Sequence, residues 1–146
     1  MKQITVEDCM SKPVKTMDAD ASARAIVKEM NKHKVASILV VDSGKPVGIV
    51  TERDILQRVI EEGRNMDTAK AKDIMSSPIR CIGSEATVKQ ASEMMALFRV
   101  KKLIVVRGDK PVGIVTMADL VKRILCLRSE ALKDWEKAIV QAWESF

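Results

Sequence analysis

The sequence predicts an α/β protein made of two copies of a β-α-β-β-α unit that pack about a pseudo-two-fold axis, followed by a C-terminal helix. Three observations predict this fold. Residues 45–51 read Lys-Pro-Val-Gly-Ile-Val-Thr and recur unchanged at residues 110–116. The 65-residue offset holds without a gap from Gln3 to Ile60, where 18 of 58 positions are identical in the second copy. Within each copy, strand-like apolar runs alternate with helix-like amphipathic runs. A copy of this size is marginal as an independent core, so we expect the two to pack together.

The elements of the first copy follow from its apolar runs and its turn residues. A short strand is expected at residues 14–17, and Asp18, Asp20 and Ser22 offer N-caps for a helix over residues 21–32. An apolar run at residues 35–41 predicts a strand buried on both faces. A turn, a strand at residues 46–50 and a helix from Thr51 to about residue 62 complete the copy. The predicted domains are residues 1–62 and 69–126 for the two motifs, 63–68 for a linker and 127–146 for the C-terminal helix.

Composition excludes several classes of protein. The 146 residues are 47% hydrophobic and 31% charged, as in soluble globular proteins. No apolar run of about 18 residues could span a membrane and no signal peptide is visible, so we expect a cytoplasmic protein without membrane contact. Three cysteines without Cys-x-x-Cys spacing and one histidine predict neither a disulfide framework nor a metal site. No nucleophile with its base and no pair of acids is visible, so we expect no catalytic residue, no catalytic cofactor and no enzyme.

The end of each repeated strand carries the candidate site residues. Thr51 and Thr116 end strands and begin helices, where unpaired backbone N–H groups and the helix dipole favour an anion such as phosphate. Asp54 and Asp119 lie three residues further on and are suited to accept hydrogen bonds from a ribose diol. The alternative is that Thr-x-x-Asp is only a capping box that stabilises the helix. In the strands, the repeated glycine indicates the close approach of another backbone or of a ligand, or else a bulge or the packing of a helix.

Several spaced motifs occur twice in the same order: Met-Ser-x-Pro at residues 10–13 and 75–78, an apolar Val-Val strand, and Gly-Ile-Val-Thr-x-x-Asp. Together they resemble a tandem pair of cystathionine-β-synthase (CBS) domains, the Bateman module, over Ile4 to Leu125. The resemblance implies a stand-alone regulatory module that binds an adenosine-containing ligand in clefts between the two domains. It also implies phosphate contacts for Thr51 and Thr116 and ribose contacts for Asp54 and Asp119. The adenine region implied for the two sites comprises Val14, Thr16, Ser37 and Ile38 in one, and Ile79, Cys81 and Leu103 in the other.

The two sites are expected to differ, because Arg53 follows Thr51 in the first copy whereas Lys102 replaces Ser37 in the second. These basic residues favour a phosphorylated ligand. We therefore expect AMP, ADP or ATP in preference to NAD or S-adenosylmethionine, whose sulfonium cation gains nothing from a basic cleft or a helix N-terminus. The alternative function is a nucleic-acid-associated or scaffold protein that uses its net charge of +5, with degenerate nucleotide sites. Without Tyr, and with few aromatics among the basic residues, nucleic acid is the weaker expectation.

The C-terminal segment carries an apolar stripe. Its members are spaced 3, 4, 4 and 3 residues apart along a predicted helix: Leu132, Trp135, Ile139, Trp143 and Phe146. The stripe either packs on the chain's own domains or contacts a partner, in a homodimer or with an effector protein. We expect a homodimer.

Overall fold

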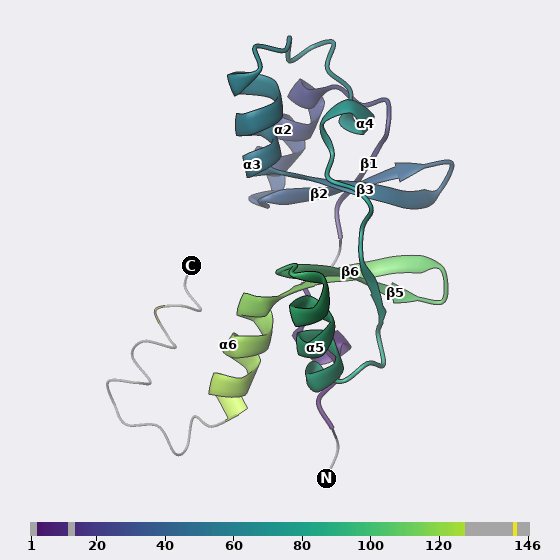
Figure 1. Cartoon of the computed structure of the whole chain (residues 1–146), viewed down its shortest axis with the longest axis vertical. Helices are drawn as coiled ribbons and strands as arrows, with labels where there is room; N and C mark the ends of the chain where they lie inside the picture. Colours follow the sequence, from purple (N-terminus) through teal and green to yellow (C-terminus); the bar gives the residue numbers. More distant parts are fainter. Residues whose placement is uncertain (1–2, 12–13, 128–141, 143–146) are drawn as a thin grey trace. The chain divides into compact units, whose positions relative to one another are not determined.

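The computed structural model describes residues 3–11, 14–127 and 142, which form a mixed α/β fold with two three-stranded sheets (Figure 1). The contacts divide the chain into two compact units. The first unit is Val14–Ile79, and the second unit consists of the described residues of the segments 1–13 and 80–146. The C-terminal stripe predicted from Leu132 to Phe146 lies outside the described residues.

The first unit has the strand order β1-β2-β3, with β1 (Thr16–Asp18) parallel to β2 (Ser37–Asp42) and β2 antiparallel to β3 (Lys45–Thr51). Helix α2 (Ala23–His33) begins at Ser22, whose hydroxyl accepts a hydrogen bond from the backbone N–H of Ala25 at 3.1 Å. It ends at Lys34 in the left-handed conformation. The helices cover one face of the sheet (Figure 1), where apolar side chains form the core: Ile26, Met30, Ile38, Val40, Val50, Val59 and Ile74.

The helix predicted from Thr51 to residue 62 begins where expected but is not a regular α-helix. A short α3 (Glu52–Asp54) leads into η1 (Ile55–Glu61), which has π-helical hydrogen bonds. The remaining helix of the first unit is α4 (Ala71–Ile74), which begins after the segment that links the two repeats.

The second unit repeats the same topology. Its sheet is β4 (Cys81–Gly83), β5 (Lys102–Arg107) and β6 (Lys110–Thr116), with the same parallel and antiparallel pairing. Its helices are α1 (Val6–Cys9), α5 (Val88–Phe98) and α6 (Met117–Leu127). Its core is again apolar: Val6, Met10, Ala91, Met95, Leu103, Val105, Val115 and Leu120.

The short helix that leads each repeat belongs to the unit of the other repeat. Ser76, which follows α4, pairs with Ile49 of β3, and Ser11, which follows α1, pairs with Ile114 of β6. The sequence repeat and the compact unit therefore have different boundaries. Met10 and Ser11 of one motif and Met75 and Ser76 of the other therefore cross from one repeat to the sheet of the other.

This crossing explains the repeated glycine in the strands. A Cβ atom added at Gly48 would lie 2.4 Å from the Met75 sulfur and 3.0 Å from the carbonyl oxygen of Ser76. At Gly113 it would lie 2.6 Å from the Met10 sulfur and 2.8 Å from the Ser11 carbonyl oxygen. The close approach is that of another backbone, as one of the sequence interpretations stated. A bulge also lies next to each glycine on its own strand, where Val47 and Val112 have no paired residue on the neighbouring strand.

Candidate functional site

The first strand–helix junction is a closed capping box. The Asp54 carboxylate accepts from the backbone N–H of Thr51 at 2.9 Å and from its hydroxyl at 3.0 Å, and the N–H of Asp54 donates to the Thr51 oxygen at 3.2 Å. The N–H of Glu52 donates to the carbonyl of Ala36. The backbone N–H groups of Thr51, Glu52 and Asp54, which an anion would otherwise contact, therefore already donate hydrogen bonds within the unit.

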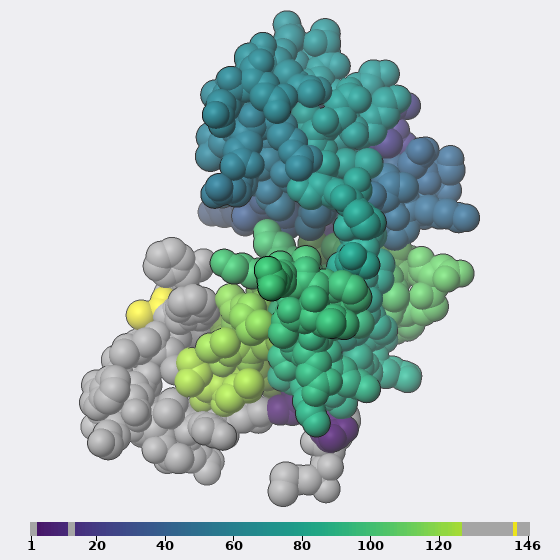
Figure 2. All heavy atoms as spheres, in the orientation of Figure 1, coloured from purple at the N-terminus to yellow at the C-terminus, as the bar shows by residue number. Residues whose placement is uncertain are grey.

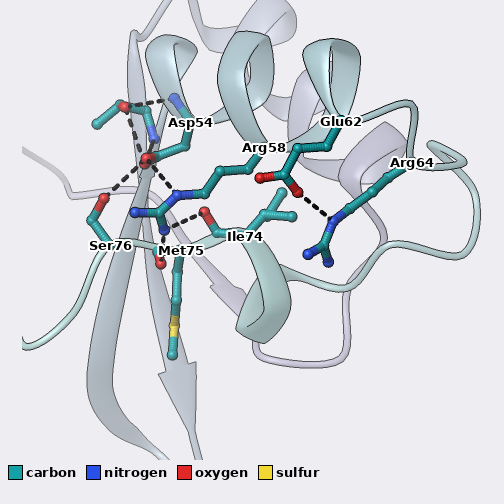
Figure 3. Close-up of polar contacts among 8 residues, drawn as sticks. Asp54, Arg58, Glu62, Arg64, Ile74, Met75 and Ser76 are labelled. Atoms are coloured by element: carbon teal, nitrogen blue, oxygen red, sulfur yellow. Dashed lines mark hydrogen bonds and ion pairs between the residues drawn. The ribbon is translucent and has the colours of Figure 1, made fainter.

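Two further side chains complete this junction in the first unit. The Ser76 hydroxyl donates to the second oxygen of Asp54 at 2.9 Å, and the Arg58 guanidinium lies 3.9 Å from it (Figure 3). The same guanidinium donates to the carbonyls of Ile74 and Met75, so it joins η1 to α4. Asp54 is only 5% exposed as a result. Ribose binding by this carboxylate stays a prediction, and it would require a change in these contacts.

The second junction has the same box in a more open form. The Asp119 carboxylate accepts from the N–H of Thr116 at 2.9 Å, and the N–H of Asp119 donates to the Thr116 oxygen at 3.1 Å. Asp119 is half-buried. Among the residues the structure describes, the O–H of Thr116 donates no hydrogen bond. It is therefore available to a ligand, whereas the O–H of Thr51 is not.

Strand pairing decides which predicted residues share a face with the two threonines. Paired residues on neighbouring strands project to the same face, and successive residues of a strand project to opposite faces. Ser37 pairs with Thr51 and Lys102 pairs with Thr116, so each pair shares a face of its sheet. The register also places Thr16 on the face of Ser37 and Cys81 on the face of Lys102.

The other predicted residues lie elsewhere. The side chains of Ile38 and Leu103 are 0% and 1% exposed and pack in the helix-covered cores, on the opposite face from Ser37 and Lys102. Arg53 is exposed on α3, and Val14 and Ile79 are half-buried just before β1 and β4. Strand pairing therefore places Thr16, Ser37 and Thr51 on the face opposite Ile38 in the first unit. It places Cys81, Lys102 and Thr116 on the face opposite Leu103 in the second.

A cavity of about 310 Å³ lies in the second unit, between α1 with its following residues and one face of α6. Its lining is mainly polar and charged: Asp8, Cys9, Met10, Ser11, Asp119, Lys122, Arg123 and Cys126. Burial raises the pKa of the Cys9 thiol; nearby Arg123 opposes this rise, and Asp8 and Asp119 add to it. Among the described residues, no three side chains of His, Cys, Asp or Glu are grouped to hold a metal ion.

Sequence reasoning missed the serine and arginine of these junctions. Ser11 with Ser76, and Arg58 with Arg123, are two of the identical pairs at the 65-residue offset. Their identity in both copies was the available signal.

The described helices include none that is both long and apolar enough to traverse a lipid bilayer.

Known proteins similar to this chain identify its family. A family model described as the CBS domain matches residues 6–61 and 71–126. The uncharacterized protein MK0525 of Methanopyrus kandleri is 32% identical over 124 residues, which are 84% of this chain and 63% of that protein. The chain thus spans less than two thirds of that relative. The CBS domain-containing protein YhcV of Bacillus subtilis is 30% identical over 116 residues, covering 80% of this chain and 82% of YhcV.

Solved structures agree with the sequence relatives. The crystal structure of an uncharacterized conserved protein from Pyrococcus horikoshii superposes with a TM-score of 0.73 at 26% identity. The match covers 84% of this chain and 94% of that one. The fold, the duplicated motifs and the family match agree: the chain belongs to the CBS-domain family and carries two tandem CBS domains.

Proposed function

We propose that the chain is a regulatory sensor that binds an adenine nucleotide, AMP, ADP or ATP, and catalyses no reaction itself. Tandem CBS domains are in general regulatory modules that bind adenosine-containing ligands. The observation that best supports a phosphorylated ligand is the second junction, where Lys102 and Thr116 share one face of the sheet. A cation and a free O–H donor beside a helix N-terminus form a favourable set for a phosphate group.

The two junctions support unequal roles. At the second junction the Asp119 carboxylate is half-buried, and one of its oxygens is bonded to the N–H of Thr116. This leaves acceptor capacity for a ribose hydroxyl. At the first junction both oxygens of Asp54 are bonded within the unit. We therefore assign the nucleotide to the second junction before the first, where binding by Thr51 and Arg53 would require the hydrogen bond from the Thr51 hydroxyl to Asp54 to open.

Calorimetric titration of the full chain with AMP, ADP and ATP tests the assignment. Lys102→Ala is expected to weaken nucleotide binding about tenfold, because a charge-assisted hydrogen bond to phosphate is lost. Lys101→Ala is the matched control, since Lys101 is the exposed neighbour of Lys102 in the chain and removes the same charge. Equal weakening by both variants would indicate only a general charge effect. If no adenine nucleotide bound and nucleic acid bound with a steep salt dependence, the alternative function would replace this one.

We also propose that the chain forms a homodimer through α6. Met117, Val121 and Ile124 are 38%, 47% and 42% exposed and follow one another at helical spacing, so they form an apolar stripe on α6. Figure 2 shows atoms of α6, in yellow-green, at the surface of the second unit. Val121→Glu is expected to convert the dimer to a monomer in light scattering, with Lys89→Glu as an exposed control. A dimer that survives Val121→Glu but dissociates when residues 127–146 are removed would assign the contact to the C-terminal segment instead. That segment is also the candidate contact for an effector protein.

A further inference from the structure

One face of α5 in the second unit is apolar, whereas the same face of α2 in the first unit is polar. Met94, Leu97 and Phe98 lie together on α5, because residues three and four apart on a helix are neighbours; they form the α5 face. The residues at the same positions of α2, 65 residues earlier in the repeat, are polar or charged: Glu29, Lys32 and His33. There the Glu29 carboxylate lies 3.0 Å from the His33 imidazole, as suits a face in contact with water. The fold therefore accepts polar residues at these positions, and the apolar α5 face needs a cause of its own.

The α5 face is open in the part of the chain that the structure describes. Leu97 is 75% exposed, the largest exposed fraction of any described large apolar side chain, and Phe98 is 39% exposed. Met94 is half-buried at the edge of the core. The Arg80 guanidinium lies 4.1 Å from the centre of the Phe98 ring and covers one side of it. Contiguous apolar side chains with charged neighbours are typical of a contact surface.

The path of the chain brings its own C-terminal segment back to this surface. Helices α5 and α6 pack side by side (Figure 1). Because Lys102 pairs with Thr116, α5 ends and α6 begins at the same end of the sheet, so α6 leads the chain away from Leu97 over about 16 Å. A turn of about four residues followed by a helix of about 11 residues would retrace that length. Such a helix would bring Trp143 level with Leu97.

We propose that residues 132–146 form a helix that packs on the α5 face of the same chain, with Trp143 against Leu97 and Phe98. The apolar stripe predicted for this segment supplies the facing side chains. The segment follows the second repeat and has no counterpart after the first, where a linker leads on to the next repeat. The proposal therefore explains why only one of two equivalent helices has an apolar face.

Charge and tethering favour this occupant. The exposed cations around the α5 face are Arg80, Arg99 and Lys101, and Glu144 follows Trp143 with the opposite charge. A covalently attached segment is present at an effective concentration of about millimolar, which favours it over a second copy of the chain at ordinary concentrations. The contact uses none of the residues assigned to nucleotide binding, so it is independent of the proposed function.

Tryptophan fluorescence of the full chain tests the contact directly. The chain has two tryptophans, Trp135 and Trp143, and both belong to this segment, so the emission reports on it alone. Leu97→Lys is expected to move the emission to the wavelength of water-exposed tryptophan. Cleavage by chymotrypsin after Trp135, followed by mass spectrometry, should become at least about tenfold faster, because loss of the apolar contact raises the population of the undocked segment.

Two further variants separate the contact from charge and stability effects. Leu56→Lys is the matched control, since Leu56 is an exposed leucine of η1 in the first unit and the change in charge is the same. It should change neither the emission nor the cleavage rate. The triple variant Met94→Glu, Leu97→Lys, Phe98→His gives α5 the residues of α2 with no change in formal net charge. It should reproduce the effect of Leu97→Lys.

The outcomes distinguish the possible occupants. Red-shifted emission and faster cleavage in both α5 variants, at unchanged molar mass in light scattering, would support the contact within one chain. A molar mass that falls in Leu97→Lys would assign the α5 face to a second copy and overturn the proposal. Water-exposed emission in the unmodified chain, or equal effects of Leu97→Lys and Leu56→Lys, would also overturn it. Titration with adenine nucleotides tests the sensor function separately, and its result does not alter these outcomes.

Discussion

Alanine at Gly113 should destabilise the second unit, because the strand at this point touches the backbone of the segment after α1. The added Cβ would lie 2.8 Å from the carbonyl oxygen of Ser11. That oxygen would have to move about 0.6 Å to reach an ordinary separation of 3.4 Å. It accepts from the N–H of Ile114 at 3.2 Å, and the N–H of Ser11 donates to the Ile114 carbonyl at 2.9 Å, so the movement strains both hydrogen bonds. The Met10 side chain, 2.6 Å away, must also shift.

The expected loss follows from these contacts. Overpacking of this kind costs about 1 to 3 kcal/mol, and weakening two backbone hydrogen bonds adds about 1 kcal/mol. We expect the free energy of unfolding to fall by about 2 to 4 kcal/mol, equivalent to roughly 5 to 12 °C in Tm for a chain of this size. Urea denaturation followed by circular dichroism measures the change. The midpoint of the circular dichroism transition should lie at a lower urea concentration for Gly113→Ala than for the unmodified chain.

Gly83→Ala is the matched control for this substitution. Gly83 lies in β4 of the same unit, has no heavy atom within 4 Å of an added Cβ, and does not have a positive φ. Its replacement should leave the stability unchanged or raise it slightly, because alanine reduces the conformational freedom of the unfolded chain. If Gly113→Ala were as stable as Gly83→Ala, the close approach of the Ser11 backbone would be refuted as the reason for the repeated glycine.

Three further perturbations test the junctions and the surface. Asp54→Asn should lower the free energy of unfolding by about 2 kcal/mol in urea denaturation. Both oxygens of the buried Asp54 carboxylate accept hydrogen bonds, and in asparagine an NH₂ group would face one of these donors. Ser76→Ala should cost about 1 kcal/mol and Ser11→Ala less than about 0.5 kcal/mol, since only the former loses a hydroxyl hydrogen bond to a buried carboxylate; equal losses would contradict the difference between the units. The hydrogen bond from Arg24 lowers the pKa of Asp67, so this pair should stabilise the fold above the ordinary pKa of about 3.9 and lose that contribution as pH falls through the lowered value. In urea denaturation between pH 7 and pH 2, Asp67→Asn should therefore lose less stability than the unmodified chain, and high salt should shrink the difference.

The sequence predicted the order and type of the strands and main helices, because these depend on local signals. The apolar runs at residues 35–41 and 46–50 and their copies became paired strands, and Ser22 became the cap of α2. The π-helical hydrogen bonds of η1 were not predicted, since no residue between Ile55 and Glu61 marks that geometry. Strand periodicity could have separated Ser37 from Ile38 and Lys102 from Leu103, because neighbours on a strand face opposite ways.

The exchange of leading segments could not be predicted from the sequence. Met10-Ser11 and Met75-Ser76 are identical, as are the strands they contact, so either pairing satisfies the same pattern. The choice depends on the lengths and directions of the connections in three dimensions. The sequence analysis included the capping box at Asp54 as an alternative. It missed the hydrogen bond from Ser76 to Asp54 for the same reason, because Ser76 comes from the other repeat.

Because the leading segments are exchanged between the repeats, the residues of the two units become complete at different times during synthesis. The first unit is a continuous segment of the chain, so all of its residues are available once Ile79 has been made. The second unit needs α1, which is made before the whole of the first unit, to meet β6, so Ser11 cannot pair until Ile114 has been made. Until then the apolar side chains of Val6 and Met10 have no core to enter, and the large loop between them and their partners must be closed at an entropic cost. A nascent chain that ends after Ile79 therefore holds one finished unit and a short helix whose apolar side chain, Val6, is still exposed to water.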